Sequence, residues 1–254
     1  MTAPLFHLAD GALAAAAPGG DVTITGDEAR HAAASMRLAP GEQVLVADGS
    51  GRRGHGTVVS SAPDAVVVRL DAVDEEPVET PRLVLVQALA KGDRDLMAVQ
   101  AATELGVDVV VPWEAERSIV RWKGPKAAKA LGKWRDTAHA AAKQARRARV
   151  PEVRPHVSGT AVAGLAAEHD DAGRLLLVLH EDAEQGLGRV PVERLAAARE
   201  VALLVGPEGG VSTAELDACV AAGAVPVRLG PHVLRASTAG PAALAVLQDR
   251  LGRW

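Results

Sequence analysis

The stretch LLVGPEGGVSTAEL, residues 203–216, contains the pattern that decides the fold of the second half of the chain. It opens with an apolar run typical of a buried strand, passes through a loop with three glycines and one acid, and ends in a helix start. Ser212 and Glu215 have the S-x-x-E spacing of a capping box, and Gly223 is placed to end that helix. Strand, glycine loop and helix N-terminus therefore meet at one point, as they do at ligand sites of α/β sheets.

The glycine loop does not have the features of a nucleotide phosphate site. Gly206, Gly209 and Gly210 let a ligand approach the main chain. The loop lacks the lysine of the Walker pattern and the spacing of a GxGxxG fingerprint, and Glu208 in its middle disfavours a phosphate. The loop therefore favours a neutral or cationic ligand, and a tight turn without any ligand is the alternative.

Apolar runs of the same kind recur after Pro81 and alternate with helical segments. The expected strands are 83–90, 107–112, 174–180, 201–206 and 225–230, and the expected helices are 93–106, 125–148, 191–199, 212–222 and 237–251. This alternation predicts an α/β domain over residues 82–254 with a largely parallel sheet. Two more strands end in unusual loops, EDAEQGLG and PHVLRASTAGPAAL, and Ser237 or Thr238 is expected to cap the last helix.

Residues 1–72 are predicted to form a separate small β domain. The runs DVTIT, EQVLVAD, GHGTVVSS and AVVVRLDAV are short and β-rich, turn residues separate them, and GDEARHAAASMRL supplies one short helix. Such a pattern is typical of a small barrel or sandwich. Residues 73–81 are acidic, contain two prolines and lack apolar periodicity, so we expect the linker there.

The composition excludes several classes of protein. No apolar stretch is long enough for a membrane span, and the alanine-rich start lacks the basic leading segment of a signal peptide. The single cysteine, Cys219, can form no internal disulfide, and we expect it to be a buried apolar side chain. The histidines are scattered without metal-ligand spacing. These features predict a cytoplasmic protein with no membrane and no metal.

Basic charge is concentrated in one segment. The net charge is −4, yet residues 117–154 hold 12 basic and 2 acidic side chains. In a helix over 125–148 the apolar residues share one arc, and most basic residues lie outside it. Such a segment predicts a polyanionic partner, with a merely solvated helix face as the alternative. Three tryptophans offer faces on which a base could stack, although one lies on the apolar arc: Trp113, Trp122 and Trp134.

Two loop motifs, LLVGPEGGVSTAEL (203–216) and LGPHVLRASTAGPAAL (229–244), together resemble those of the SPOUT-class RNA methyltransferases. Within that class, the chain resembles the RsmE family of 16S rRNA uridine N3-methyltransferases. Further stretches agree in order: MRLAPGEQVLVADGSG (36–51), ALAKGDRDLMAVQAATELGVDVVVPWEAERSIVR (88–121), QARRARVPEV (144–153) and LVLHED (177–182). The resemblance therefore spans nearly the whole chain.

The resemblance implies a PUA-like, RNA-binding β-barrel at 1–72 and a trefoil-knotted SPOUT methyltransferase domain at 82–254. It also implies a homodimer that binds S-adenosylmethionine in a bent shape among three loops and acts on 16S rRNA of the small ribosomal subunit. The residues implied to contact the donor are Leu179, His180, Gly206, Pro207, Glu208, Gly209, Leu229, Gly230, Val233, Leu234, Arg235 and Thr238. The residues expected to contact RNA are Arg117, Arg121, Arg147 and Arg149, with Arg30 and Arg37 on the β domain.

The chemistry narrows the catalytic candidates. Methyl transfer from a sulfonium donor is an in-line displacement that needs no metal and depends on near-attack geometry. Uridine N3 loses a proton, and an arginine aimed at the ring oxygens stabilises the charge that develops there. We predict that Arg235 does this. Glu208 and His180 are candidates for the proton acceptor, and direct transfer to water is the alternative.

The chain departs from the common family sequence at several positions. Ala236 and Ser237 stand where Thr and Glu are common, His232 where Arg is frequent, Ala101 where Lys is frequent, and Lys143 where Glu is frequent. The missing acid keeps a non-catalytic RNA-binding assembly factor as one alternative. A SPOUT methyltransferase with another target, such as ribose 2′-O-methylation of tRNA, is the other.

Overall fold

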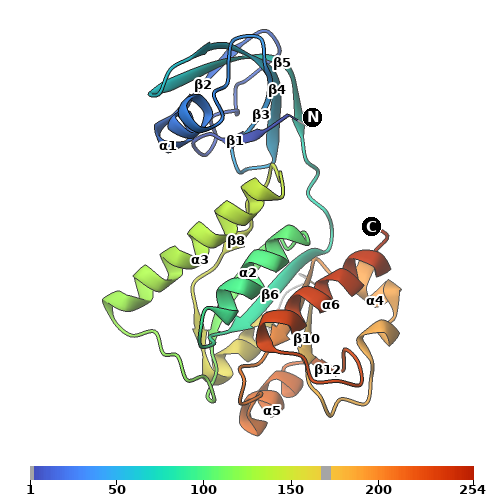
Figure 1. Ribbon diagram of the computed structural model, residues 1–254. Coiled ribbons are helices and arrows are strands. Elements are labelled where there is room, and N and C mark those ends of the chain that lie inside the picture. The colour runs from blue at the N-terminus through green and yellow to red at the C-terminus, as the bar shows by residue number, and fades with distance from the viewer. Residues whose placement is uncertain (1–2, 167–172) are drawn as a thin grey trace. The chain divides into compact units, whose positions relative to one another are not determined.

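The computed structural model describes residues 3–166 and 173–254, and the chain forms two compact units (Figure 1). One unit contains Met1–Pro77 with Ala142–Val150, and the other contains Val78–Ala141 with Pro151–Trp254. This division differs from the predicted boundaries in two ways. The last strand of the first unit continues to Glu75, three residues into the predicted linker 73–81. Residues 142–150, which follow more than sixty residues of the second unit, pack with the first unit. The periodicity of the sequence did not predict that the chain returns to the first unit.

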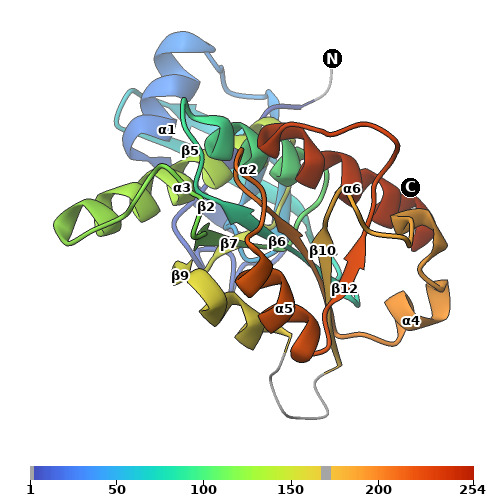
Figure 2. The same cartoon turned by 90° about the horizontal axis from the view of Figure 1, so that it is seen from below.

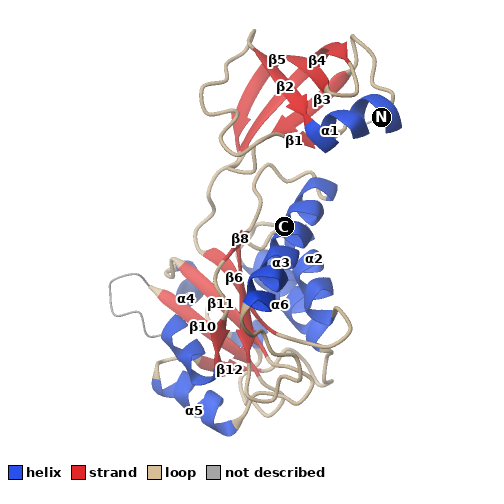
Figure 3. Ribbon diagram, turned by 90° about the vertical axis from the view of Figure 1, so that its left-hand side faces the viewer, coloured by secondary structure: helices blue, strands red, loops and turns tan. Residues whose placement is uncertain are grey.

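The first unit is built on a five-stranded sheet with the order β1-β3-β4-β5-β2, drawn in red with helix α1 beside it in Figure 3. Its strands are β1 (Leu5–His7), β2 (Asp21–Thr25), β3 (Gln43–Ala47), β4 (Arg52–Ser61) and β5 (Ala65–Glu75). Helix α1 (Gly26–Arg30) continues into a π-helical turn, His31–Ser35. Strand β1 pairs parallel with β3, whereas the other pairs are antiparallel. The predicted small β domain is confirmed, and only the three-residue β1 was missed.

The second unit is an α/β domain with a parallel sheet, as predicted. Its strands are β6 (Arg82–Ala88), β7 (Val109–Glu114), β8 (Glu152–Val153), β9 (Val157–Ser158), β10 (Arg174–Leu179), β11 (Glu200–Val205) and β12 (Val225–Val227). The order is β12-β10-β11-β6-β7-β8, with β9 also paired to β7, and every pair is parallel. All carboxyl ends of these strands therefore face one edge of the sheet. The trefoil knot implied by the resemblance stays a prediction.

Helices cover both faces of this sheet (Figure 2). They are α2 (Arg94–Glu104), α3 (Pro125–Gln144), α4 (Val192–Ala196), α5 (Thr213–Ala221) and α6 (Ala236–Arg250). Buried residues of α2, α3 and α6 pack on one face, against strand residues such as Leu85 and Leu203. Cys219 of α5 packs on the other face, and burial raises the pKa of its thiol to about 11. Within the described residues, no helix combines the length and the apolar character that crossing a bilayer requires.

The helix ends differ in part from the sequence predictions. The capping box is confirmed, because the Ser212 hydroxyl accepts from the Glu215 amide and the Glu215 carboxylate accepts from the Ser212 amide. The predicted cap of the last helix is wrong: α6 begins at Ala236, so Ser237 and Thr238 lie inside its first turn. Helix α3 ends at Gln144 rather than at residue 148 because the chain turns at Arg146, whose φ is 57°.

The tryptophans are part of the packed interior. Trp113 is fully buried, Trp134 is 2% exposed and Trp122 is 9% exposed. The rings of Trp122 and Trp134 meet edge to face, with centroids 5.7 Å apart. The interpretation of these rings as stacking platforms for a base is therefore wrong, because their faces are covered by the protein.

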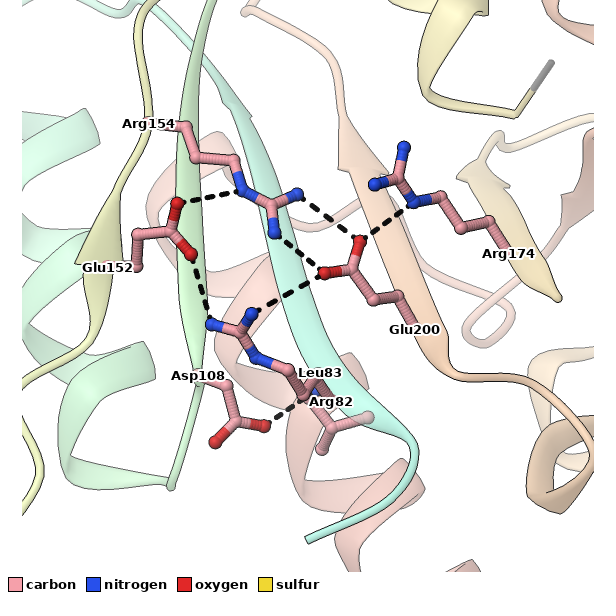
Figure 4. A network of polar contacts seen from close by, with 7 residues as sticks. All are labelled: Arg82, Leu83, Asp108, Glu152, Arg154, Arg174 and Glu200. Atoms are coloured by element: carbon pink, nitrogen blue, oxygen red, sulfur yellow. Dashed lines mark hydrogen bonds and ion pairs between the residues drawn. The ribbon is translucent and has the colours of Figure 1, made fainter. Parts of the chain in front are cut away.

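The amino-terminal edge of the parallel sheet is closed by an ion-pair network (Figure 4). Arg154 binds Glu200 through two nitrogens at 2.7 and 3.2 Å, and Arg174 reaches the same carboxylate at 3.1 Å. Arg82 joins Glu200 to Glu152, at 3.7 and 3.1 Å. Burial opposes ionisation of both glutamates, but the hydrogen bonds and charge of the arginines prevail, so the pKa of each carboxyl is lowered.

Candidate functional site

A cavity of about 710 Å³ lies at the carboxyl-terminal edge of the parallel sheet. Residues 179–182 after β10, residues 205–211 after β11 and residues 233–236 before α6 form most of its wall. The rest of the wall comes from Arg94, the first residue of α2, from Arg117, in the loop after β7, and from Thr213, Leu216 and Ala239 of α5 and α6. A volume of this size suits a cofactor-sized ligand.

A smaller cavity of about 150 Å³ shares part of this wall. It is lined by Leu179 and His180 on one side and by the loop from Arg228 to Leu234 on the other. The three strand-end loops singled out in the sequence therefore meet around two neighbouring cavities. All residues predicted to contact the donor line one cavity or both, except Thr238, which is exposed in the first turn of α6.

Packing within the protein, and not only a ligand, explains the glycines of the loop after β11. A Cβ on Gly206 would lie 3.0 Å from the Val211 side chain, and one on Gly209 would lie 3.1 Å from Cβ of Arg117. Gly210 has a φ of +73°, which a residue with a side chain rarely adopts. The bare main chain that faces the cavity is therefore held in place by packing behind it.

Glu208, in the middle of this loop, is anchored as an anion. Its carboxylate accepts a hydrogen bond from Arg94 at 2.8 Å. Burial alone raises the pKa of this carboxyl, but hydrogen bonds from its own amide, from Arg94 and from the Lys91 amide outweigh burial, so the pKa is lowered. This arrangement favours a permanently charged anchor over a proton acceptor.

Arg117 also contacts this loop, and further hydrogen bonds hold the loop that carries Arg117. The Arg117 guanidinium donates to the carbonyl of Gly209 at 3.1 Å. The Glu215 carboxylate accepts from the Glu116 amide at 2.7 Å, which ties the loop to α5. Arg121 donates to the carbonyls of Ala115 and Glu116 at 2.9 and 2.6 Å, so its guanidinium closes its own loop.

Arg235 differs from the other arginines of the cavity. Its side chain is exposed and lines the larger cavity, and among the described residues it has no hydrogen bond or ion pair. His180, which lines the same cavity, accepts a hydrogen bond from the Asp182 amide at Nδ1, at 3.2 Å. A neutral His180 ring therefore carries its proton on Nε2, which makes that nitrogen a donor.

The other predicted RNA contacts lie in the first unit. Arg149 donates to the Glu76 carbonyl at 3.1 Å, and its guanidinium covers Gly51, where an added Cβ would clash with it. The carbonyl of Arg147 lies 3.2 Å from the His7 ring nitrogen. Arg30 is paired with Asp27, and Arg37 is exposed with a φ of 56°. Arg149 therefore has a packing role that the charge pattern did not indicate.

The unusual Lys143 also has a structural explanation. Its ammonium lies 2.5 and 2.7 Å from the two carboxylate oxygens of Glu28 and 5.8 Å from the centre of the Phe6 ring. A glutamate at this position would place two carboxylates together. The departure is therefore compensated by an acid and an aromatic ring of the first unit.

Sequence reasoning missed Arg94. The signal was available, because GDR directly follows the first strand of the α/β domain and opens a helix at the edge where ligands bind. Among the described residues, no group of three or more His, Cys, Asp or Glu side chains is arranged to hold a metal ion.

Comparisons with known proteins identify relatives along most of the chain. Residues 77–248 match the family model described as an RNA methyltransferase domain, and residues 24–71 match the one described as an RNA methyltransferase PUA domain. The ribosomal RNA small subunit methyltransferase E of Mycobacterium tuberculosis is 39% identical over 93% of this chain and 89% of its own length. The protein of that name from Bacillus subtilis is 29% identical over 89% of this chain and 88% of its own.

Solved structures of similar fold include a protein of the same name. The ribosomal RNA small subunit methyltransferase E of Neisseria gonorrhoeae, bound to S-adenosyl methionine, superposes with a TM-score of 0.83 at 26% identity and covers 98% of both chains. A Legionella pneumophila protein described as a methyltransferase, solved with the bound cofactor SAM, has a TM-score of 0.82 at 30% identity and also covers 98% of both chains. The predicted PUA-like and methyltransferase architecture is confirmed.

Proposed function

The chain belongs to the RNA methyltransferase family whose curated members are named ribosomal RNA small subunit methyltransferase E, and we propose that it methylates N3 of a uridine in 16S rRNA. S-adenosylmethionine is the methyl donor. One observation carries this function: the cavity at the carboxyl edge of the sheet, which residues of three strand-end loops line.

The residues present fit the donor. Gly206, Gly209 and Gly210 keep the wall free of side chains, and a Cβ at the first two would press on Val211 or Arg117. The Glu208 carboxylate sets a negative charge in the same wall, which suits the positively charged sulfonium of the donor. When bound, S-adenosylmethionine supplies an electrophilic methyl group on a sulfonium.

Arg235 is the residue that we assign to charge stabilisation. Its guanidinium lines the donor cavity and has no partner among the described residues, so its N–H groups are available to a substrate. Loss of the N3 proton spreads negative charge onto the oxygens of the uracil ring. A preorganised cation that meets this charge lowers the barrier, whereas the same cation contributes little before the charge develops.

The geometry does not favour either protein group for the proton. Glu208 is held as a carboxylate by Arg94. In a neutral His180 ring, Nδ1 accepts the Asp182 amide, so Nε2 carries the proton and cannot accept another. We propose that the N3 proton leaves to water and that Glu208 acts as an anchor.

We assign RNA binding to exposed basic residues of α3 and of the cavity wall. Lysines on α3 are exposed: Lys126, Lys129 and Lys133. Arg117 contributes from the cavity wall. We also propose that the protein acts as a homodimer and in the cytoplasm, as the resemblance implies.

Methylation of hypomethylated small ribosomal subunits tests the function. Purified protein and labelled donor should place one methyl group on N3 of a single uridine of 16S rRNA, mapped by mass spectrometry. A methyl group on ribose or on another RNA identifies a different target. Donor binding by calorimetry without any methylation identifies a non-catalytic factor.

A further inference from the structure

Arg94 lines the donor cavity, although neither the loop motifs nor the charge distribution assigned it a role. It is the first residue of α2 and follows Gly92 and Asp93, whose φ angles are +63° and 56°. The Asp93 carboxylate binds the Lys133 ammonium of α3 at 3.0 Å. The short turn before Arg94 is therefore tied to the basic helix.

The guanidinium of Arg94 has donors to spare. It carries five N–H groups, and among the described residues it donates to the Glu208 carboxylate, at 2.8 Å. The side chain is 41% exposed, and that of Glu208 is 31% exposed. An ion pair this open to water contributes little to the stability of the fold. Its main consequence is positional, because it holds the guanidinium at the cavity.

Arg117 is held in the same way by the neighbouring residue. Its guanidinium donates to the Gly209 carbonyl at 3.1 Å and is otherwise exposed. Two guanidinium groups are therefore attached to consecutive residues of the glycine loop, Glu208 and Gly209. Each retains N–H groups that no described residue occupies.

An RNA substrate would bring phosphate groups to the guanidinium groups of Arg94 and Arg117. A base that reacts inside the cavity remains attached to its ribose, so the phosphates on either side must pass the cavity wall. Guanidinium groups bind phosphate oxygens through two parallel hydrogen bonds. We propose that Arg94 binds an RNA phosphate next to the methylated nucleotide and that Glu208 is its positioning residue.

This inference rests on the proposed function, and the experiment keeps the two apart. Full-length wild type, Arg94→Ala and Arg94→Gln are assayed on hypomethylated small subunits over a range of salt concentrations. Donor affinity is measured separately by calorimetry without RNA. In Arg94→Ala we expect a KM for subunits about tenfold higher, unchanged donor affinity, and a log–log salt slope shallower by about 0.7 to 0.9. Arg94→Gln retains hydrogen-bond donors but no charge, so it should show the same loss of slope.

The controls make each result decisive. Arg194→Ala removes an exposed arginine of α4 that lines neither cavity, and it should match the wild type. Glu208→Gln should raise the KM less than Arg94→Ala does, because it releases the guanidinium without removing it. An unchanged salt slope in both Arg94 variants overturns the proposal, and so does a loss of donor affinity, which would assign Arg94 to the donor carboxylate. Inactivity of the wild type would instead refute the proposed function.

Discussion

Arginine side chains gather at both edges of the parallel sheet, and their partners differ from one edge to the other. At the amino edge, Arg82, Arg154 and Arg174 share the carboxylates of Glu152 and Glu200 (Figure 4). The shared carboxylate of Glu200 is mostly buried, with a side chain 11% exposed. At this edge, each of the three arginines is therefore paired with a glutamate of the protein.

At the carboxyl edge, the arginines are attached by single contacts or by none. Arg94 donates to the Glu208 carboxylate and Arg117 donates to one carbonyl, whereas the Arg235 side chain has no partner among the described residues. The same type of side chain therefore stabilises the fold at one edge and remains available to a ligand at the other. The difference lies in the number of acceptors that the chain supplies.

The largest effect is expected from Arg235→Ala. Removing the unpartnered cation should lower the methylation rate about a hundredfold or more, because the charge on the uracil oxygens is no longer met. Stability should hardly change, since the side chain makes no cap bond at α6. Single-turnover assays and thermal melts measure the two quantities.

Arg235→Lys sharpens this result. It keeps the charge but loses the planar fork, so a rate between those of the wild type and Arg235→Ala is expected. An Arg235→Ala enzyme with wild-type turnover would remove this residue from the mechanism.

The reverse outcome is expected at the amino edge for Glu200→Gln. The change leaves three guanidinium groups around a neutral amide and should destabilise the protein by about 2 kcal/mol. Methylation by the folded protein should not change. Urea denaturation and activity assays at low temperature measure this, with Glu193→Gln, an exposed acid of α4, as the control. Equal stability of the two variants would mean that the network is not stabilising.

The same network predicts how stability depends on pH. The folded-state pKa values of Glu152 and Glu200 lie below the ordinary value of 4.5. Their contribution is therefore fully present above that value and is lost as the pH falls through the lower folded-state values. Thermal melts between pH 7 and pH 3 should show a falling Tm below about pH 5. Glu200→Gln should show a flatter curve, and parallel curves for both proteins would contradict the assignment.

The sequence predicted most of the strands and helices, but it did not show which partner each arginine would have. Long apolar runs and glycine loops predicted the strands whose ends form the cavities, whereas β8 and β9, two residues each, are too short for any periodicity. Arg117, Arg121 and Arg149 come from one basic segment and look equivalent in sequence.

Their roles depend on acceptors that only folding supplies. Arg121 is bound by carbonyls five and six residues earlier, and Arg149 by Glu76, which lies 73 residues away. Of the three, Arg117 alone lines the larger cavity. Local patterns cannot report such pairings, because they are set by the path of the chain between them.

The smallest effect is expected at the framework of the carboxyl edge. The Ser212 hydroxyl accepts the Glu215 amide at 3.3 Å, and Glu215 in turn holds the Glu116 amide in the loop that carries Arg117. Ser212→Ala should cost about 1 kcal/mol of stability through the lost cap. It should weaken binding of the subunits only slightly, because Glu215 still holds the loop.

Ser158→Ala is the matched control, since Ser158 precedes a 3₁₀ helix without making a cap bond. Its stability should equal that of the wild type, and the difference between the two variants isolates the hydroxyl of Ser212. If Ser212→Ala instead lowered methylation as strongly as Arg235→Ala, activity at the carboxyl edge of the sheet would depend on the cap of α5. The function of the arginines at the carboxyl edge would then depend on how firmly α5 holds the loops that carry them. The two edges would differ more in the rigidity of their loops than in the number of acceptors for each arginine.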